Sequence, residues 1–330
     1  MPFVAKDADN IEAVKTLIAY EADLDWKNSD GWTAAASCHD FTMLKVLLDA
    51  GSDAKDPEAM IGAIYRKCAP SVRLLLSKGA DPNAIGTHGP ILHYAFEHEC
   101  DEIVKVLLEH DANPNVMNPN GRLLADLYTE CHNVEMLRLL LDYGADPSAL
   151  DAHGVPLLWR PSNHDDESTV RLLLERGANV HWAHADGCPL TWWSVSQGHC
   201  EITDVLLSHG ADANWQQGWQ FLLRIAVDEI DVCMVDILLR HGANPNMRGE
   251  HELPLIVNAV QKNLEDITAT LLHSGADVNA KDAHGIPLVA QPIIYSLHAA
   301  HLLNIILSHH PDVSWTDANR DSLAILAIQA

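Results

Sequence analysis

One short signal recurs along the chain: a small residue followed by an acidic residue or asparagine. The small residue of each copy is used below as an anchor, and the ten anchors are Ala22, Ser52, Ala80, Ala112, Ala145, Ala178, Ala211, Ala243, Ala276 and Pro311. Successive anchors are 28 to 35 residues apart, most often 32 or 33. A nearly fixed period of this size is typical of repeat architectures. The sequence therefore predicts one structural unit per period, with neighbouring units stacked on each other.

A helix is predicted just before most anchors. There the sequence has a mostly apolar triplet, a polar or charged pair and then glycine, as in VLLDAG, LLLSKG, LLLDYG, LLLERG, VLLSHG, ILLRHG and TLLHSG. Apolar residues at helical spacing that end at glycine indicate a helix closed by a left-handed cap. The repeat from Ser52 to Ala80 is shorter than the others and lacks turn residues, so it is expected to pass almost directly into a helix.

The chain resembles the ankyrin-repeat family. The resemblance is carried by GADPNA (79–84), GADPSA (144–149), GANPNM (242–247) and GADVNAKDAHGIPL (275–288), and it extends over nearly the whole chain. It implies an all-α repeat solenoid of about nine to ten ankyrin units, with β-hairpin fingers and a concave groove. We expect a single domain over 1–330, with an N-terminal cap at 1–21, repeats at 22–310, and a C-terminal cap or partial repeat at 311–330.

Charge and cysteine content limit the partners and the compartment. The chain has 46 Asp and Glu against 21 Lys and Arg, a net charge of −25 with neutral His. So acidic a surface repels phosphate backbones and anionic lipid, which argues against nucleic-acid and membrane partners. The seven cysteines are scattered and form no CxxC pair. With no signal-peptide core and no long apolar run, these features predict a cytoplasmic protein, which we expect to be a monomer.

Alignment of the repeats on their anchors separates scaffold positions from the rest. The residue twelve positions after the anchor is leucine in eight repeats: Leu92, Leu124, Leu157, Leu190, Leu223, Leu255, Leu288 and Leu323. This column predicts the packed core of the first helix of each repeat. Histidine recurs eight residues after the anchor, but glycine follows it in most repeats, which indicates a turn. One His per finger cannot converge on a metal ion, so no metal site is predicted.

Other columns carry bulky aromatic and polar side chains in the middle of the chain. In the ankyrin family, the position fifteen residues after the anchor is usually alanine, and here it is Arg160, Trp193, Asn258 or Gln291 in several repeats. We infer that such side chains face the groove, although a repacked core is the alternative. The predicted ligand-binding residues are Trp159, Arg160, Trp182, Trp192, Trp193, Trp215, Trp219, Arg224, Asn258 and Gln291.

Two classes of function follow from this site. The first is a binding module that holds a protein, a peptide or a small ligand in an aromatic- and Arg-lined groove, without a cofactor. The alternative is a cofactor-independent enzyme, of isomerase or cyclase type, acting on a small organic molecule. Its candidate acids and bases are His93, Asp126, His184 and Asp186. The chain has no recognisable catalytic motif, so a closed pocket would favour the enzyme and an open groove would favour the binding module.

Overall fold

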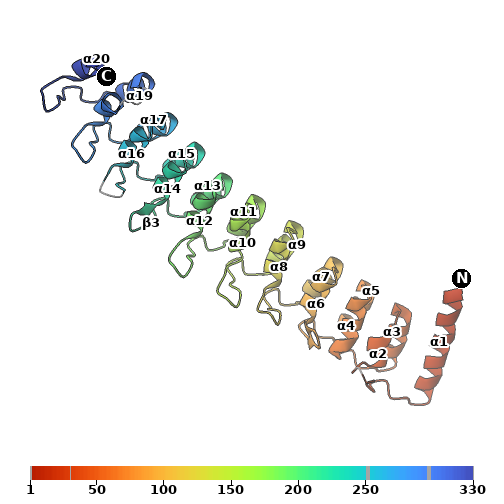
Figure 1. Cartoon of the computed structure of the whole chain (residues 1–330). Helices are drawn as coiled ribbons and strands as arrows, with labels where there is room; N and C mark the ends of the chain where they lie inside the picture. The colour runs from red at the N-terminus through yellow and green to blue at the C-terminus, as the bar shows by residue number, and fades with distance from the viewer. Residues whose placement is uncertain (1, 30, 250–252, 296–298, 330) are drawn as a thin grey trace. The chain divides into compact units, whose positions relative to one another are not determined.

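The chain folds into a series of short helix pairs joined by loops (Figure 1). The structure is a computed structural model, and it describes residues 2–29, 31–249, 253–295 and 299–329. The helices are α1 (Pro2–Ala19), α2 (Ala34–Ser37), α3 (Phe41–Asp49), α4 (Pro57–Tyr65), α5 (Ala69–Ser77), α6 (Ile91–Glu97), α7 (Asp101–Leu108), α8 (Leu124–Glu130), α9 (Val134–Asp142), α10 (Trp159–Asn163), α11 (Glu167–Glu175), α12 (Leu190–Gln197), α13 (Cys200–Ser208), α14 (Leu222–Asp228), α15 (Val232–Arg240), α16 (Leu255–Gln261), α17 (Glu265–His273), η2 (Leu288–Ala290, a 3-10 helix), α18 (Gln291–Ile294), α19 (Ala299–Leu307) and α20 (Leu323–Gln329).

Contacts divide the chain into two units, 1–157 and 158–330, called the N-terminal and the C-terminal unit below. Within each unit, the two helices of a repeat contact each other and the equivalent helices of the next repeat, as α12 and α13 do with α14 and α15. This is the nearest-neighbour packing of an all-α repeat solenoid. Among the described helices, none combines the length and the apolar character needed to cross a lipid bilayer.

The leucine column is buried as predicted. Leu92, Leu124, Leu157, Leu190, Leu223, Leu255 and Leu288 each expose 2% or less of their surface. Leu323, in the last repeat, is only half-buried. Burial of one such side chain contributes roughly 1.5–3 kcal/mol, so the column is a main source of stability.

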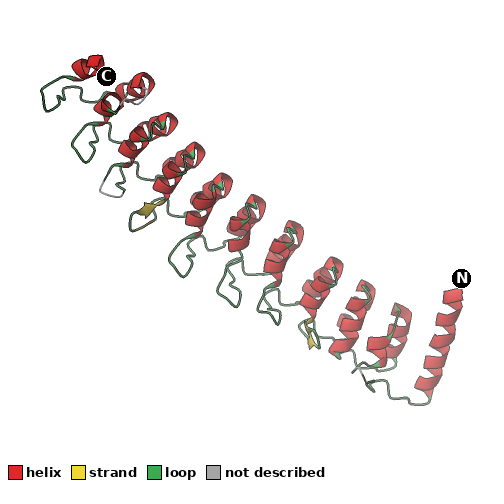
Figure 2. Ribbon diagram, in the orientation of Figure 1, coloured by secondary structure: helices red, strands yellow, loops and turns green. Residues whose placement is uncertain are grey.

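Several of the described fingers are closed by Asp or Asn side chains. Two other fingers contain short antiparallel strands (Figure 2): β1 (Ile85–Gly86) pairs with β2 (Gly89–Pro90), and β3 (Gln216–Gln217) pairs with β4 (Gln220–Phe221). In two of the fingers closed by Asp, the main-chain N–H groups of His153 and His284 donate to the carboxylates of Asp151 and Asp282. This confirms that these histidines occupy turns. No group of three or more His, Cys, Asp or Glu side chains among the described residues is placed to hold a metal ion.

The short repeat after Ser52 has no hairpin strand, as expected. The Asp56 carboxylate accepts a hydrogen bond from the Glu58 N–H, and Pro57 is the first residue of α4. Proline is favoured at this position because the N–H that it lacks has no partner there in any helix. The chain therefore enters the helix directly instead of forming a finger.

Several repeats have an asparagine three residues after the anchor, and its side chain links the repeat to the next one. The Asn246 amide donates to the Gly275 carbonyl oxygen at 3.1 Å, and its oxygen accepts from the Asp277 N–H at 2.8 Å. Asn83, Asn115 and Asn214 make the same pair of bonds to the repeat that follows each of them. Each of these side chains therefore satisfies two backbone groups of its neighbour. This set is called the asparagine ladder below.

Replacing Asn246 with alanine is expected to lower the free energy of unfolding by about 1–2 kcal/mol, because two hydrogen bonds between repeats are lost. The measurement is a urea unfolding curve followed by circular dichroism. Asn304→Ala is the matched control, since Asn304 is exposed on α19, and its curve should shift by less than about 0.5 kcal/mol. Equal effects of the two substitutions would contradict a role of the ladder in stability.

Candidate functional site

Four of the predicted tryptophans form one cluster in the C-terminal unit. Trp159 lies on α10, Trp192 and Trp193 on α12, and Trp182 in the finger between them. The ring centre of Trp159 is 5.7 Å from that of Trp182 and 5.1 Å from that of Trp193. The rings of Trp192 and Trp193 are 4.9 Å apart and nearly perpendicular, at 89°. These four residues are called the indole cluster below.

Two rings of the cluster come from different alignment positions. Trp159 and Trp193 are fourteen and fifteen residues after their anchors, so simple alignment places them in different columns. However, α10 begins at Trp159, two alignment positions later than α12, which begins at Leu190. Pro161 explains the delay, because in a helix starting at Leu157 it would have to donate an N–H to the Leu157 carbonyl.

The indole cluster is neither core nor free surface. All four tryptophans are half-buried, and Trp192 also contacts the hydrophobic core of the C-terminal unit. The indole nitrogens of Trp192 and Trp193 are buried without a hydrogen-bond partner among the described residues. Edge-to-face packing compensates in part, because it places the positively polarised edge of one ring against the face of another. The cluster thus combines a large apolar area with partial access to solvent.

A histidine and a carboxylate lie beside the cluster. The His184 ring stacks with Trp159 at 27° and 6.3 Å, and its Nδ1 is 3.2 Å from the Asp186 carboxylate. A hydrogen bond from the Cys188 N–H, followed by the contact with His184, holds the pKa of Asp186 below its ordinary value. Both side chains are about half exposed, with 47% for His184 and 53% for Asp186. The pair is therefore open to a ligand.

The predicted arginines have different surroundings. Arg160 is half-buried on α10, next to Trp159. Arg224 lies on α14, where it donates to the Asp228 carboxylate at 3.2 Å and to the Trp219 carbonyl at 3.1 Å. Trp219 is 54% exposed in a finger, whereas Trp215 packs against the core. No ring contact joins Trp215 or Trp219 to the indole cluster among the described aromatic pairs.

Asp228 is a charged group that the sequence reasoning missed. Its carboxylate accepts from Lys262 at 2.7 Å as well as from Arg224. Burial opposes ionisation, but the hydrogen bonds and charges of Lys262 and then Arg224 hold the pKa of Asp228 below its ordinary value. The spacing of four residues between Arg224 and Asp228 is the signal that could have revealed the first of these pairs.

Gln291 does not face a groove, contrary to the prediction. It is completely buried, with 0% exposure, and its amide donates to the Ile286 carbonyl at 3.3 Å. The physical reason begins with Pro292, which has no N–H to donate to the Leu288 carbonyl in a helix starting at Leu288. The 3-10 helix η2 therefore forms first, and α18 begins at Gln291. Gln291 is thus part of a repacked core, which was the alternative to a position facing the groove. Asn258, on α16, is half-buried.

His93 and Asp126 belong to the N-terminal unit, and neither is placed as an accessible acid or base. His93 is 2% exposed, and its Nε2 is 2.8 Å from the Val116 carbonyl oxygen. Burial lowers the pKa of His93, which favours the neutral ring. The Asp126 carboxylate is 6% exposed and accepts two hydrogen bonds from Arg122, at 2.6 and 2.8 Å. The hydrogen bonds of His93 and Asp126 therefore stabilise the fold.

Two cavities of the described chain are lined by other residues. One of about 370 Å³ in the N-terminal unit is lined by Pro82, Asn83, Ala84, Ile85, Pro90, Ile91, Leu92, Asn113 and Val116. Another, of about 550 Å³, lies in the C-terminal unit between the turns at Ile230 and Leu264. None of their lining residues belongs to the predicted ligand site. The four tryptophans of the indole cluster instead contact one another.

Comparison with known proteins identifies the repeats. The model of the family "Ankyrin repeats (3 copies)" matches residues 3–86, 34–118, 60–151, 92–182 and 191–282. Among solved structures, the ankyrin repeat domain of Bcl-3, a member of the IkappaB protein family, is similar with 22% sequence identity and a TM-score of 0.42. That match covers 75% of this chain and 97% of the Bcl-3 chain. A search of curated proteins found no match. The family matches cover well over half of the sequence, and the chain belongs to the ankyrin-repeat family.

Proposed function

We propose that the C-terminal unit binds a protein or peptide segment through the indole cluster. Ankyrin repeats imply a protein-binding module, and the cluster is the part of this module best suited to anchor a partner. The observation that carries the proposal is that four tryptophans from adjacent repeats contact each other and yet remain half-buried. Tryptophan is enriched among the few interface residues that supply most of the binding energy.

The partner is expected to be basic. The net charge is −25, and exposed carboxylates include Asp186, beside the cluster, and Asp165. Asp165 is 3.4 Å from His199, so it lies on the surface of the same repeats. Complementary charge mainly raises the association rate, and salt reduces that effect. Free thiols at all seven cysteines support a reducing, cytoplasmic location, and we propose a monomer.

A pull-down from cell lysate tests the indole cluster. We expect the Trp192→Ala/Trp193→Ala variant to lose its partners, with a dissociation constant raised at least about thirtyfold, as for the loss of 2 kcal/mol or more at a hot spot. Trp26→Ala is the matched control, because Trp26 is 68% exposed and lies in the N-terminal unit. Trp159→Ala serves as a second variant if the double substitution unfolds the protein. Retention of every partner by folded variants of both kinds would refute the proposal.

The alternative function is a cofactor-independent enzyme. It is supported by the His184 and Asp186 pair beside the Trp159 ring, since a carboxylate that orients an imidazole is a common arrangement for a general base. A metabolite extract incubated with the wild type and with His184→Gln separates the two functions. Conversion of a small molecule by the wild type alone would favour the enzyme, whereas capture of protein alone favours the binding module.

A further inference from the structure

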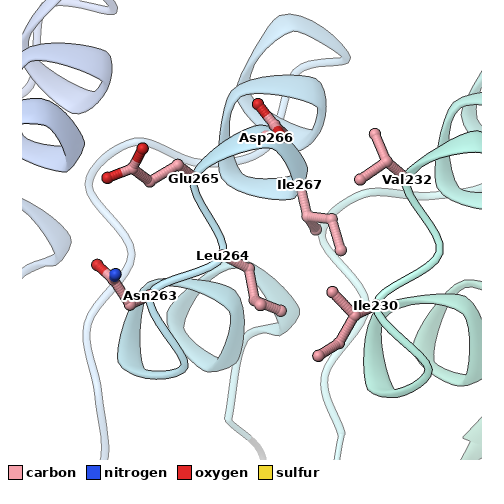
Figure 3. A pocket seen from close by; sticks show the side chains of 7 residues that line it. All are labelled: Ile230, Val232, Asn263, Leu264, Glu265, Asp266 and Ile267. Atoms are coloured by element: carbon pink, nitrogen blue, oxygen red, sulfur yellow. The ribbon is translucent and has the colours of Figure 1, made fainter.

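A cavity in the C-terminal unit lies between the turns that join the two helices of adjacent repeats. It has a volume of about 550 Å³ and is called the turn pocket below; its lining residues are Ile230, Val232, Asn263, Leu264, Glu265, Asp266 and Ile267. In Figure 3, Ile230 and Val232, at the start of α15, face Leu264 and Ile267, at the start of α17. Ile230 and Val232 are exposed and Leu264 is half-buried, so these three present apolar surface to the open pocket, while Ile267 is 1% exposed.

Ile230 adopts a conformation that is unfavourable for its residue type. Its φ is +60°, in the left-handed region, where a β-branched side chain is strained. The same turn position in other repeats holds Lys67, Glu99, His132, Asp165 and Asn263, all with positive φ and none β-branched. Ile230 is also 58% exposed, so burial within the fold does not offset the strain. Strained residues of this kind are concentrated at functional sites.

Acidic groups border this apolar surface. The two turns read DEIDV (228–232) and KNLED (262–266), which gives five carboxylates against one lysine. Asp228 is bound to that lysine, Lys262, at 2.7 Å and to Arg224 at 3.2 Å, and Glu265 lies 2.7 Å from His301. The carboxylates of Glu229, Asp231 and Asp266 complete the acidic border. Figure 3 shows the carboxylates of Glu265 and Asp266 pointing away from the four aliphatic side chains. The Asn263 amide oxygen is buried without a hydrogen-bond partner among the described residues. The pocket therefore offers apolar surface with carboxylates at its border, both suited to a cationic ligand with an apolar side chain.

We propose that the turn pocket binds a basic peptide segment of a partner protein, which inserts one aliphatic side chain between Ile230 and Leu264 and places flanking Lys or Arg residues beside the carboxylates. The aliphatic side chain covers Ile230 and removes apolar surface from water. The flanking cations match the charge of the two turns. This surface is separate from the indole cluster, so a partner could occupy either one without the other.

Defined peptides test the proposal by NMR of methyl-labelled protein. The probes are Ac-KRLKR-NH2, its alanine analogue Ac-KRAKR-NH2 and the acidic Ac-EELEE-NH2. We expect the first peptide to shift the methyl signals of Ile230 and Ile267 and to bind at least about tenfold more tightly than the other two. Equal shifts with KRLKR and KRAKR, or binding of EELEE at the same methyl groups, would overturn the proposal.

Ile230→Asn separates binding from folding. The chain itself uses asparagine at the equivalent position, Asn263, so the substitution should relieve strain and raise Tm by about 2–4 °C. The same variant should lose at least about tenfold in affinity for KRLKR. Ile85→Asn is the control, because Ile85 is 71% exposed on a finger strand and should not affect KRLKR binding. Undiminished binding by the more stable Ile230→Asn protein would overturn the proposal.

Failure of this proposal and failure of the indole-cluster proposal have different signatures. The Trp192→Ala/Trp193→Ala variant should bind KRLKR as the wild type does, because neither tryptophan lines the turn pocket. Loss of KRLKR binding in that variant, while it remains folded, would place the peptide at the indole cluster and refute the turn pocket. Loss caused only by Ile230→Asn supports the turn pocket, whatever the pull-down shows.

Discussion

Replacing Leu190 with alanine is expected to lower the free energy of unfolding by about 2–5 kcal/mol, the range for removing a large aliphatic side chain from a core. Leu190 is 0% exposed, and it is the first residue of α12, in the repeat that carries Trp192 and Trp193. The loss combines transfer of the buried atoms to water with the cavity that they leave. The measurement is urea unfolding followed by circular dichroism.

Leu307→Ala is the matched control for Leu190→Ala. Leu307 lies on α19 in the same unit and is 39% exposed, so its truncation should cost less than about 1 kcal/mol. The comparison holds the residue type constant and varies only burial. A cost below about 1 kcal/mol for Leu190→Ala as well would show that the leucine column is not the main support of the fold.

Replacing Arg122 with alanine is the second substitution with a large expected effect, a loss of about 3 kcal/mol in the free energy of unfolding. The Asp126 carboxylate, 6% exposed, would lose both hydrogen bonds from the Arg122 guanidinium. Glu130 would lose its contact with the same group, at 2.6 Å. Removing one partner of a buried ion pair costs more than the pair contributes, because the other charge stays in a poorly solvated site.

A double substitution checks that explanation. Arg122→Ala combined with Asp126→Asn should recover much of the lost stability, because the uncompensated charge is gone. Urea unfolding of the wild type, both single variants and the double variant completes the cycle. If the double variant is as unstable as the sum of the single variants, the cost does not come from a buried carboxylate. The result also bears on function, since it assigns Asp126 to the scaffold and not to acid–base chemistry.

The fold was largely predictable because its determinants repeat. The leucine column that includes Leu190 could be predicted because every repeat must bury the same position against its neighbours. The apolar residue therefore recurs at a fixed distance from the anchor. The structure of the short repeat after Ser52 was also predictable, because that repeat lacks the turn residues that a finger requires. Agreement among many copies made these predictions reliable where one copy would not have been.

The candidate site was only partly predictable. Trp159, Trp192 and Trp193 stood out because indoles replaced smaller residues, and the structure does bring them together. Gln291 stood out for the same reason and is nevertheless buried. Alignment on anchors assumes that every helix begins at the same place, and Pro161 and Pro292 move that start. Side chains in those repeats therefore have environments that column position alone does not give.

Backbone strain lies further beyond sequence reasoning. The left-handed turn recurs at the equivalent position of other repeats, and only the β-branched residue, Ile230, is particular to this one; the letters DEID alone do not indicate φ of +60°. The turn pocket likewise depends on two segments about thirty residues apart in sequence. A periodic pattern predicts the features that all repeats share, whereas the turn pocket depends on the residues in which one repeat differs from the others.

The asparagine ladder gives the chain a direction. Each ladder side chain binds the backbone on both sides of the next anchor, as Asn214 binds Gly242 and, in the repeat that follows, Asn244. During synthesis on the ribosome, the N-terminal member of each such pair emerges first. A newly made repeat therefore meets hydrogen-bonding groups that are already in place, and assembly can proceed one repeat at a time from the N-terminus.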